Sequence, residues 1–182
     1  PEKCVIYGNP PFGRQSTLAK KFLRHACEKA SVVAFILPRS FTKPSMQTVI
    51  PRCFHLHSEW TLPSNAFLVN GQPYNVPCVF QIWIKQETLR PVPAKVEPDG
   101  FTFVSPSEAY DLVFRRVGVN AGKCSLSGPA YSPQSHYFVK LDDPEKASGI
   151  VAASLTHEFP TNTTGPRSLS KGEAIEFLNQ HT

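Results

Sequence analysis

One tetrapeptide, Asn9-Pro10-Pro11-Phe12, constrains the fold more than any other feature of the chain. It follows the apolar run Cys4-Val5-Ile6-Tyr7 and precedes a long helical pattern, so we expect a strand, a sharp turn and a helix in succession. In open α/β sheets, ligands bind in the crevice outside the carboxyl ends of the strands. The sequence therefore predicts that the tetrapeptide lies at a ligand site.

The chemistry of the tetrapeptide suits a planar ring that carries an exocyclic amine. The Asn9 side chain offers an acceptor oxygen, and Pro10 offers a backbone carbonyl without an N–H of its own. Phe12 offers an aromatic face on which a flat ring can stack. Two acceptors and an aromatic face predict a pocket for the amino group of adenine. The alternative interpretation is a Pro-Pro turn after a strand, with Phe12 filling the core.

The tetrapeptide resembles motif IV of amino-group methyltransferases that use S-adenosylmethionine. The wider stretch resembles the N6-adenine DNA methyltransferases over roughly residues 1–85. Besides the motif with Gly13, the resemblance rests on the run Val33-Ala34-Phe35-Ile36-Leu37-Pro38-Arg39-Ser40-Phe41 and on the run Val76-Pro77-Cys78-Val79-Phe80-Gln81-Ile82-Trp83. It implies an α/β fold: the C-terminal half of a Rossmann-like methyltransferase sheet with a small α+β appendage.

The resemblance also implies a function, which is methyl transfer to the N6 amine of adenine in DNA, as in restriction–modification systems or phages. The implied catalytic residues are Asn9, Pro10, Pro11 and Phe12. Within this enzyme class, methylation of adenine in RNA or of glutamine in proteins stays open, because the motifs overlap at Asn-Pro-Pro.

The chain departs from the family pattern because the cofactor motif, a Gly-rich turn followed by a strand that ends in an acidic residue, is missing. Only eight residues precede Asn9, and Gly118-Val119-Asn120-Ala121-Gly122 has the wrong spacing for such a turn. We interpret the chain as the C-terminal part of a longer enzyme, which by itself is inactive and does not bind S-adenosylmethionine. The alternative is a non-catalytic module that binds nucleic acid or completes a partner subunit.

A half-sheet would leave the strand at residues 3–7 at an edge, although the apolar run predicts that its side chains are buried. Bare apolar edge strands are templates for pairing. We expect this strand to pair with a missing N-terminal segment, with a second subunit or with a second copy of the chain. Residues 32–37 are continuously apolar, which predicts a strand that is covered on both faces.

Three parts are expected: a catalytic-motif half at 1–85, a Pro-rich linker at 86–100, and an α+β region at 101–182 that is a candidate for target recognition. In the first part we expect helices at 15–30 and 44–50, strands at 53–62 and 76–85, and a loop between these strands. The apolar stripe of the first helix contains Leu18, Phe22, Ala26 and Ala30, with Leu23 and Cys27 beside it. In the last part we expect strands at 101–104, 111–119 and 135–141, a helical turn at 106–110, and helices at 143–156 and 170–179, the last with a capping box of Ser170 and Glu173.

The net charge of +5 suits a polyanionic partner, and we interpret the C-terminal segment as basic, which favours DNA. The candidate contacts to nucleic acid are Arg39, Lys43, Arg115, Arg116, Asn120, Lys123 and Arg167. The five cysteines are scattered and form no cluster with histidines, so we expect reduced thiols and no metal site. No apolar run approaches the length of a membrane span, and we expect the protein in the cytoplasm, at the nucleoid if it is bacterial.

Overall fold

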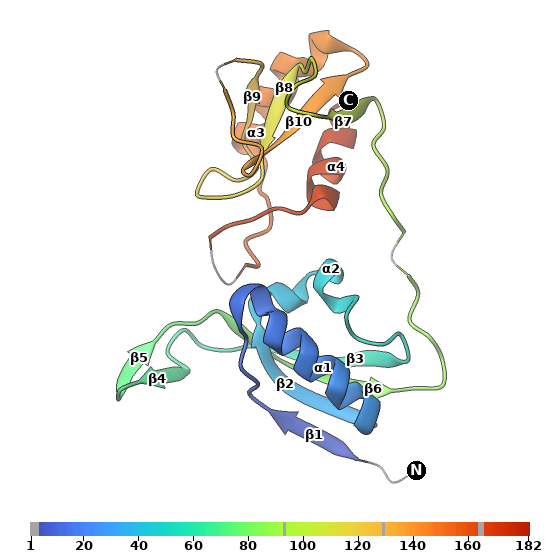
Figure 1. Ribbon diagram of the computed structural model, residues 1–182, viewed down its shortest axis with the longest axis vertical. Coiled ribbons are helices and arrows are strands. Elements are labelled where there is room, and N and C mark those ends of the chain that lie inside the picture. Colours follow the sequence, from blue (N-terminus) through green and yellow to red (C-terminus); the bar gives the residue numbers. More distant parts are fainter. Residues whose placement is uncertain (1–3, 93, 129, 164–165) are drawn as a thin grey trace. The chain divides into compact units, whose positions relative to one another are not determined.

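The computed structural model describes residues 4–92, 94–128, 130–163 and 166–182 of the chain. The chain forms a mixed α/β structure with two compact units (Figure 1). The first unit contains Pro1–Pro93 with Asn162–Thr164, and the second contains Ala94–Thr161 with Gly165–Thr182. The boundary after Pro93 lies inside the segment that the sequence predicts as a linker.

The first unit is built on a four-stranded sheet. Its strands lie in the order β1 (Val5–Gly8), β2 (Val32–Pro38), β6 (Cys78–Lys85) and β3 (Phe54–Thr61). β1 and β2 are parallel, whereas β6 is antiparallel to both of its neighbours. A separate hairpin of β4 (Phe67–Val69) and β5 (Gln72–Tyr74) occupies the segment predicted as a loop.

Helix α1 (Thr17–Lys29) connects β1 to β2, as predicted, and a short 3-10 helix, η1 (Arg14–Ser16), precedes it. The face that packs on the sheet contains Ala19, Leu23, Ala26 and Cys27. Leu18 and Phe22 are 40% and 47% exposed, so the predicted buried stripe is wrong at these two positions. Three of the four buried side chains are small, which lets the helix approach the sheet closely. The helical segments η2 (Arg39–Thr42) and α2 (Pro44–Gln47) follow β2.

β1 lies at the edge of the described sheet, as predicted, but its side chains are not buried. Val5 is 56% exposed and Tyr7 is 80% exposed. The prediction that β2 is covered on both faces is confirmed only in part. Val33, Phe35 and Leu37 pack beneath α1. On the opposite face, Ala34 is buried, whereas Val32 and Ile36 are only half-buried.

A buried polar network crosses the centre of the first unit. The Gln81 side chain is fully buried, accepts a hydrogen bond from Trp83 Nε1 at 3.0 Å and donates one to Glu59 at 2.6 Å. The Arg90 guanidinium lies 5.0 Å from the centre of the Trp83 ring and donates to the carbonyl of Ile50 at 3.0 Å. Arg90 therefore fastens the start of the predicted linker to the first unit.

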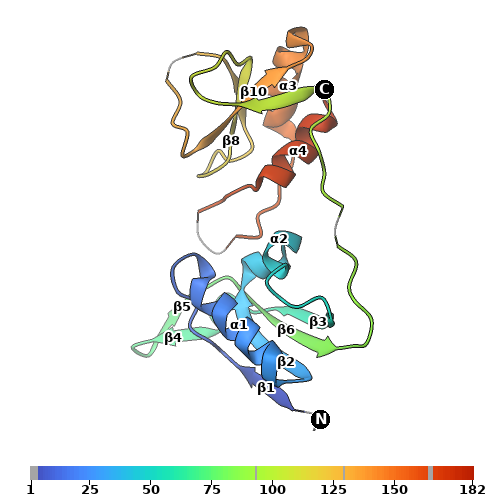
Figure 2. The ribbon, with the colours of Figure 1, turned by 45° about the vertical axis from the view of Figure 1, so that its right-hand side comes forward.

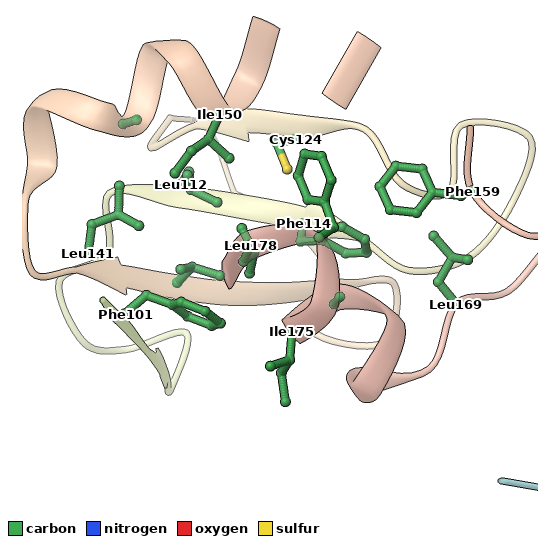
Figure 3. Packing of buried hydrophobic residues seen from close by; sticks show 14 of the residues in the cluster. Phe101, Leu112, Phe114, Cys124, Leu141, Ile150, Phe159, Leu169, Ile175 and Leu178 are labelled. Atoms are coloured by element: carbon green, nitrogen blue, oxygen red, sulfur yellow. The ribbon is translucent and has the colours of Figure 1, made fainter. Parts of the chain in front are cut away.

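The second unit contains an antiparallel sheet and two longer helices. The sheet order is β7 (Phe101–Val104), β10 (His136–Leu141), β8 (Leu112–Arg115) and β9 (Cys124–Leu126). The helical segments are η3 (Pro144–Lys146), α3 (Ala147–Thr156) and α4 (Lys171–Asn179). Figure 3 shows the core of this unit, in which side chains from the sheet and from both α-helices meet around Phe114.

Several predicted elements of the second unit differ from the structure. The strand predicted at 111–119 ends at Arg115, and β9 occupies part of the predicted loop. Residues 106–110 form a turn rather than a helix, closed by the bond from Glu108 N to the Ser105 carbonyl. The capping box is confirmed, because the Ser170 hydroxyl accepts from Glu173 N while the Glu173 carboxylate accepts from Ser170 N.

All five cysteines are free thiols. Burial raises the pKa of Cys27 and of Cys124 to about 12 and that of Cys78 to about 11, so these three act as protonated core side chains. Within the described residues, no group of His, Cys, Asp and Glu side chains is arranged to hold a metal ion. A search of the same residues also finds no helix with the length and apolar character needed to cross a membrane.

Candidate functional site

The four residues of the tetrapeptide line one open cleft at the carboxyl end of β1. The cleft has a volume of about 430 Å³, and the hairpin β4–β5 with its flanking residues forms its other wall. The lining residues are Asn9, Pro10, Pro11, Phe12, Phe67, Leu68, Val69, Tyr74 and Val76. An open cleft thus lies at the end of β1, where the strand–turn–helix pattern predicts a ligand site.

The tetrapeptide presents different groups to the cleft and to the core. Asn9 is exposed, and its side chain forms no hydrogen bond with any residue that the structure describes. Its amide oxygen can therefore accept a hydrogen bond from a ligand. Phe12 is half-buried, because its ring packs against the core of the first unit and also lines the cleft. The alternative interpretation of Phe12 as a core residue is thus confirmed in part, and its role as a stacking surface stays a prediction.

The turn after the tetrapeptide is fixed by its backbone. The Phe12 carbonyl accepts hydrogen bonds from Leu18 N at 3.1 Å and from Ala19 N at 3.2 Å. Gly13 has φ +69°, and a Cβ at this position would lie 2.7 Å from Leu18 Cγ. Gln15 and Ser16 also have positive φ, which is uncommon for residues with a side chain. The cleft wall is thus held in one conformation by the first turn of α1.

Replacing Gly13 with alanine should destabilise the first unit by about 2–3 kcal/mol, because the side chain adds a collision with Leu18 to the cost of a positive φ. Gly71 provides a matched control, since its φ is +77° but a Cβ added there would meet no atom within 4 Å. Gly71→Ala should cost only about 1 kcal/mol. Urea denaturation measures both losses, and equal losses would show that the contact with Leu18 is unimportant.

Of the candidate contacts to nucleic acid in the first unit, only one lies at the edge of the sheet where the cleft opens. β1 and β2 are parallel, so Arg39, which follows β2, lies at the same edge as Asn9. Arg39 is half-buried and is not part of the cleft lining. Lys43 is only 8% exposed, so its side chain is not presented to a polyanion.

The candidates in the second unit fall into two groups. Arg115 donates to the Val117 carbonyl at 3.2 Å, Arg116 stacks over Tyr137, and Arg167 donates to the Phe159 carbonyl at 2.7 Å. These three arginines are held by contacts within the unit. Asn120 and Lys123 are exposed, and they are the candidates here that a nucleic acid can reach without rearrangement.

The basic excess of the chain lies in the first unit. This unit contains eleven Lys and Arg residues against four Asp and Glu residues, whereas the second contains eight against ten. The interpretation of the C-terminal segment as basic is therefore wrong. In the first unit, several of the cations lie on or just before α1, next to the tetrapeptide: Arg14, Lys20, Lys21, Arg24 and Lys29. The unit that contains the cleft therefore carries the net positive charge of the chain.

The second wall of the cleft was not among the predicted site residues, although the sequence contains a signal for it. Asn70-Gly71 is the commonest dipeptide of a two-residue hairpin turn, and it lies between Phe67-Leu68-Val69 and Gln72-Pro73-Tyr74. Both turn residues have the positive φ that such a turn requires. The hairpin that contains Leu68 and Tyr74 could therefore have been predicted from the sequence. Its position across the cleft from Asn9 could not, because that depends on the tertiary structure.

Comparisons of the chain with protein-family models, with curated proteins and with solved structures gave no match.

Proposed function

We propose that this chain is the catalytic-motif half of an S-adenosylmethionine-dependent methyltransferase that acts on the N6 amine of adenine in DNA. The observation that carries the proposal is that Asn9, Pro10 and Phe12 line one open cleft at the carboxyl end of β1. The parallel β1–α1–β2 unit and the positive charge of the first unit agree with a nucleic-acid ligand at this edge.

In the proposed reaction, the residues of this chain hold and orient the amine. The lone pair of the exocyclic nitrogen is delocalised into the adenine ring, which makes it a weak nucleophile. When Asn9 Oδ1 and the Pro10 carbonyl accept its two N–H groups, the nitrogen becomes more pyramidal and the lone pair more available. Phe12 stacks on the base, which must leave the duplex to enter the cleft. Orientation and electrostatics supply the rate, and no general base is assigned.

The described residues do not fit a site for S-adenosylmethionine. The two glycines nearest to a Gly-rich turn, Gly118 and Gly122, both have positive φ. A Cβ at Gly122 would lie 2.3 Å from the Phe159 ring, and one at Gly118 would contact the Arg115 guanidinium. Gly122 is therefore packed against the Phe159 ring and leaves no room there for a cofactor, and the contact at Gly118 is an ordinary one. We therefore assign the binding of S-adenosylmethionine to a separate half of the enzyme and not to the glycines of this chain.

A second candidate function is favoured by the free edge of β1. A module that completes a partner's sheet would use this edge, and it would need neither the Asn9 oxygen nor the cleft. Recognition of an adenine amine in the cleft distinguishes the two functions, because only the methyltransferase half requires it.

The test compares two single-stranded oligonucleotides that differ only in one base. One contains a single adenine, and the other contains N6,N6-dimethyladenine, which has no N–H to donate. We expect the chain to bind the adenine oligonucleotide about tenfold more tightly, because a cleft acceptor is left unpaired by the dimethylated base. Fluorescence anisotropy measures both affinities.

Asn9→Ala should remove the difference between the two oligonucleotides, and Asn65→Ala, which changes an exposed amide outside the cleft, should preserve it. Equal affinity of the unmodified chain for the two oligonucleotides would contradict the proposed recognition. Calorimetry of the chain with S-adenosylmethionine alone should give no binding heat, and measurable binding would contradict the assignment of the cofactor to a separate half.

A further inference from the structure

The side of α1 that faces away from the sheet is basic and has almost no compensating negative charge. Lys20, Lys21 and Arg24 belong to the helix, and Arg14 lies in η1 just before it. The one carboxylate of α1 is Glu28, and it contacts a histidine of the same helix at 3.4 Å. Among the residues that the structure places, none of the four cations forms an ion pair with a carboxylate. We name these four residues the α1 cation track.

The geometry of the helix gathers these cations beside the cleft. With 3.6 residues per turn, Lys20, Lys21 and Arg24 lie within about 100° of one another around the helix axis. Lys21 and Arg24 are exposed, and Lys20 is half-buried. The first turn of α1 donates two backbone hydrogen bonds to the Phe12 carbonyl, and Figures 1 and 2 show that α1 begins at the end of the sheet where β1 ends. The track therefore starts next to the cleft and leads away from it.

This arrangement of charge opposes the stability of the helix itself. Lys20 and Arg24 are four residues apart and Lys21 and Arg24 are three apart, which are the spacings at which like charges on a helix repel. The first turn contains no acidic residue, although one there would be favourable with the helix dipole. Lys29, by contrast, lies in the last turn, where a cation is favourable. Residues that break local rules without a structural gain are expected at functional sites.

We propose that the α1 cation track binds the phosphates of the nucleic-acid strand whose base enters the cleft. The ten residues from Arg14 to Arg24 span about 15 Å along a helix. At about 3.4 Å per nucleotide, this length matches about four phosphates of a stacked strand. Phosphate contacts of this kind position a strand without reading its sequence. The inference rests on the proposed function for the identity of the polyanion, and it adds the surface that holds the strand.

The packing of α1 favours a nucleic acid over a lipid surface. A helix that lies on a membrane buries an apolar face between the lipids. The apolar face of α1, with Leu23, Ala26 and Cys27, is already packed against the sheet. Leu18 and Phe22 are the exposed apolar side chains of the helix, and two such residues do not make a second apolar face.

The test measures how the affinity for a short oligothymidylate depends on salt concentration. Thymine has no exocyclic amine, so this ligand reports contacts to the backbone and not recognition in the cleft. In the double variant Lys21→Gln/Arg24→Gln, the slope of log K against log salt should fall in magnitude by about 1.4, because each phosphate contact on a single strand contributes about 0.7. Fluorescence anisotropy measures the affinities.

The matched control is Lys29→Gln/Lys85→Gln, which removes the same charge from two exposed residues of the same unit. These lysines lie at the other end of the sheet, near the start of β2. Their double variant should keep the slope of the unmodified chain. Urea denaturation separates a lost contact from a lost structure: the midpoint of Lys21→Gln/Arg24→Gln should equal or exceed that of the unmodified chain, because a like-charge pair is removed.

Three results would overturn the proposal. The first is an unchanged slope in Lys21→Gln/Arg24→Gln, and the second is an equal fall in both double variants, which would show a general effect of net charge. The third is a chain that does not bind oligothymidylate; binding to vesicles of phosphatidylserine and phosphatidylcholine would then assign the track to a lipid surface. If the expected change in slope occurs but adenine is not preferred over N6,N6-dimethyladenine, the phosphate surface stands and the proposed function alone is refuted.

Discussion

Replacing Asn9 with alanine should abolish methyl transfer in an enzyme assembled from this chain and an S-adenosylmethionine-binding half. The Asn9 oxygen is the exposed acceptor in the cleft, and the proposed mechanism has no other side chain that could orient the amine. Loss of one preorganised polar group in an active site lowers kcat by about 100- to 1,000-fold. Binding of the cofactor should persist, because no cofactor contact is assigned to Asn9.

The measurement is transfer of a labelled methyl group to an adenine-containing oligonucleotide, together with calorimetry for cofactor binding. Asn9→Asp separates the chemical role from a structural one, because the carboxylate keeps acceptor oxygens at the same position. It should retain more activity than Asn9→Ala. Asn65→Ala, which changes an exposed residue outside the cleft, should leave turnover unchanged. Near-normal turnover of Asn9→Ala would remove the basis for the role of this residue.

The parts of the fold that could be predicted from the sequence are those with local signals. The run at residues 32–37 ends at Pro38, and the structure places β2 at Val32–Pro38. Ser170 and Glu173 are three residues apart before an apolar stretch, and they form the predicted capping box. Each of these signals depends only on residues that are close in the sequence, so the element can be predicted without knowledge of the tertiary structure.

Burial could not be predicted in the same way, because it depends on what covers an element. Tyr7 and Phe22 belong to apolar patterns, yet both are largely exposed in this chain. Leu68 and Tyr74 line the cleft only because the hairpin lies across from the tetrapeptide. The distribution of charge, by contrast, could have been predicted by counting the charged residues of each part. The basic excess belongs to the unit that contains Asn9 and not to the second unit.

Trp83→Ala should destabilise the first unit by about 4 kcal/mol, the loss that is typical when a large buried aromatic side chain is removed. Trp83 is fully buried, and the deletion leaves a cavity between α1 and the sheet core. It also leaves the Gln81 Oε1 atom without its donor and the Arg90 guanidinium without the ring on which it stacks. A buried acceptor that loses its partner adds a desolvation cost of about 1–3 kcal/mol.

Trp60 is the matched control for Trp83, because the two tryptophans of the chain lie in neighbouring strands of one sheet. Trp60 is 52% exposed, so Trp60→Ala should cost about 1 kcal/mol or less. Each variant keeps one tryptophan, whose fluorescence reports urea unfolding of the first unit alone. Equal losses in the two variants would mean that the network of Gln81, Trp83 and Arg90 does not stabilise the sheet behind the cleft. The cleft wall at Asn9 would then depend on α1 and Gly13 alone for its position.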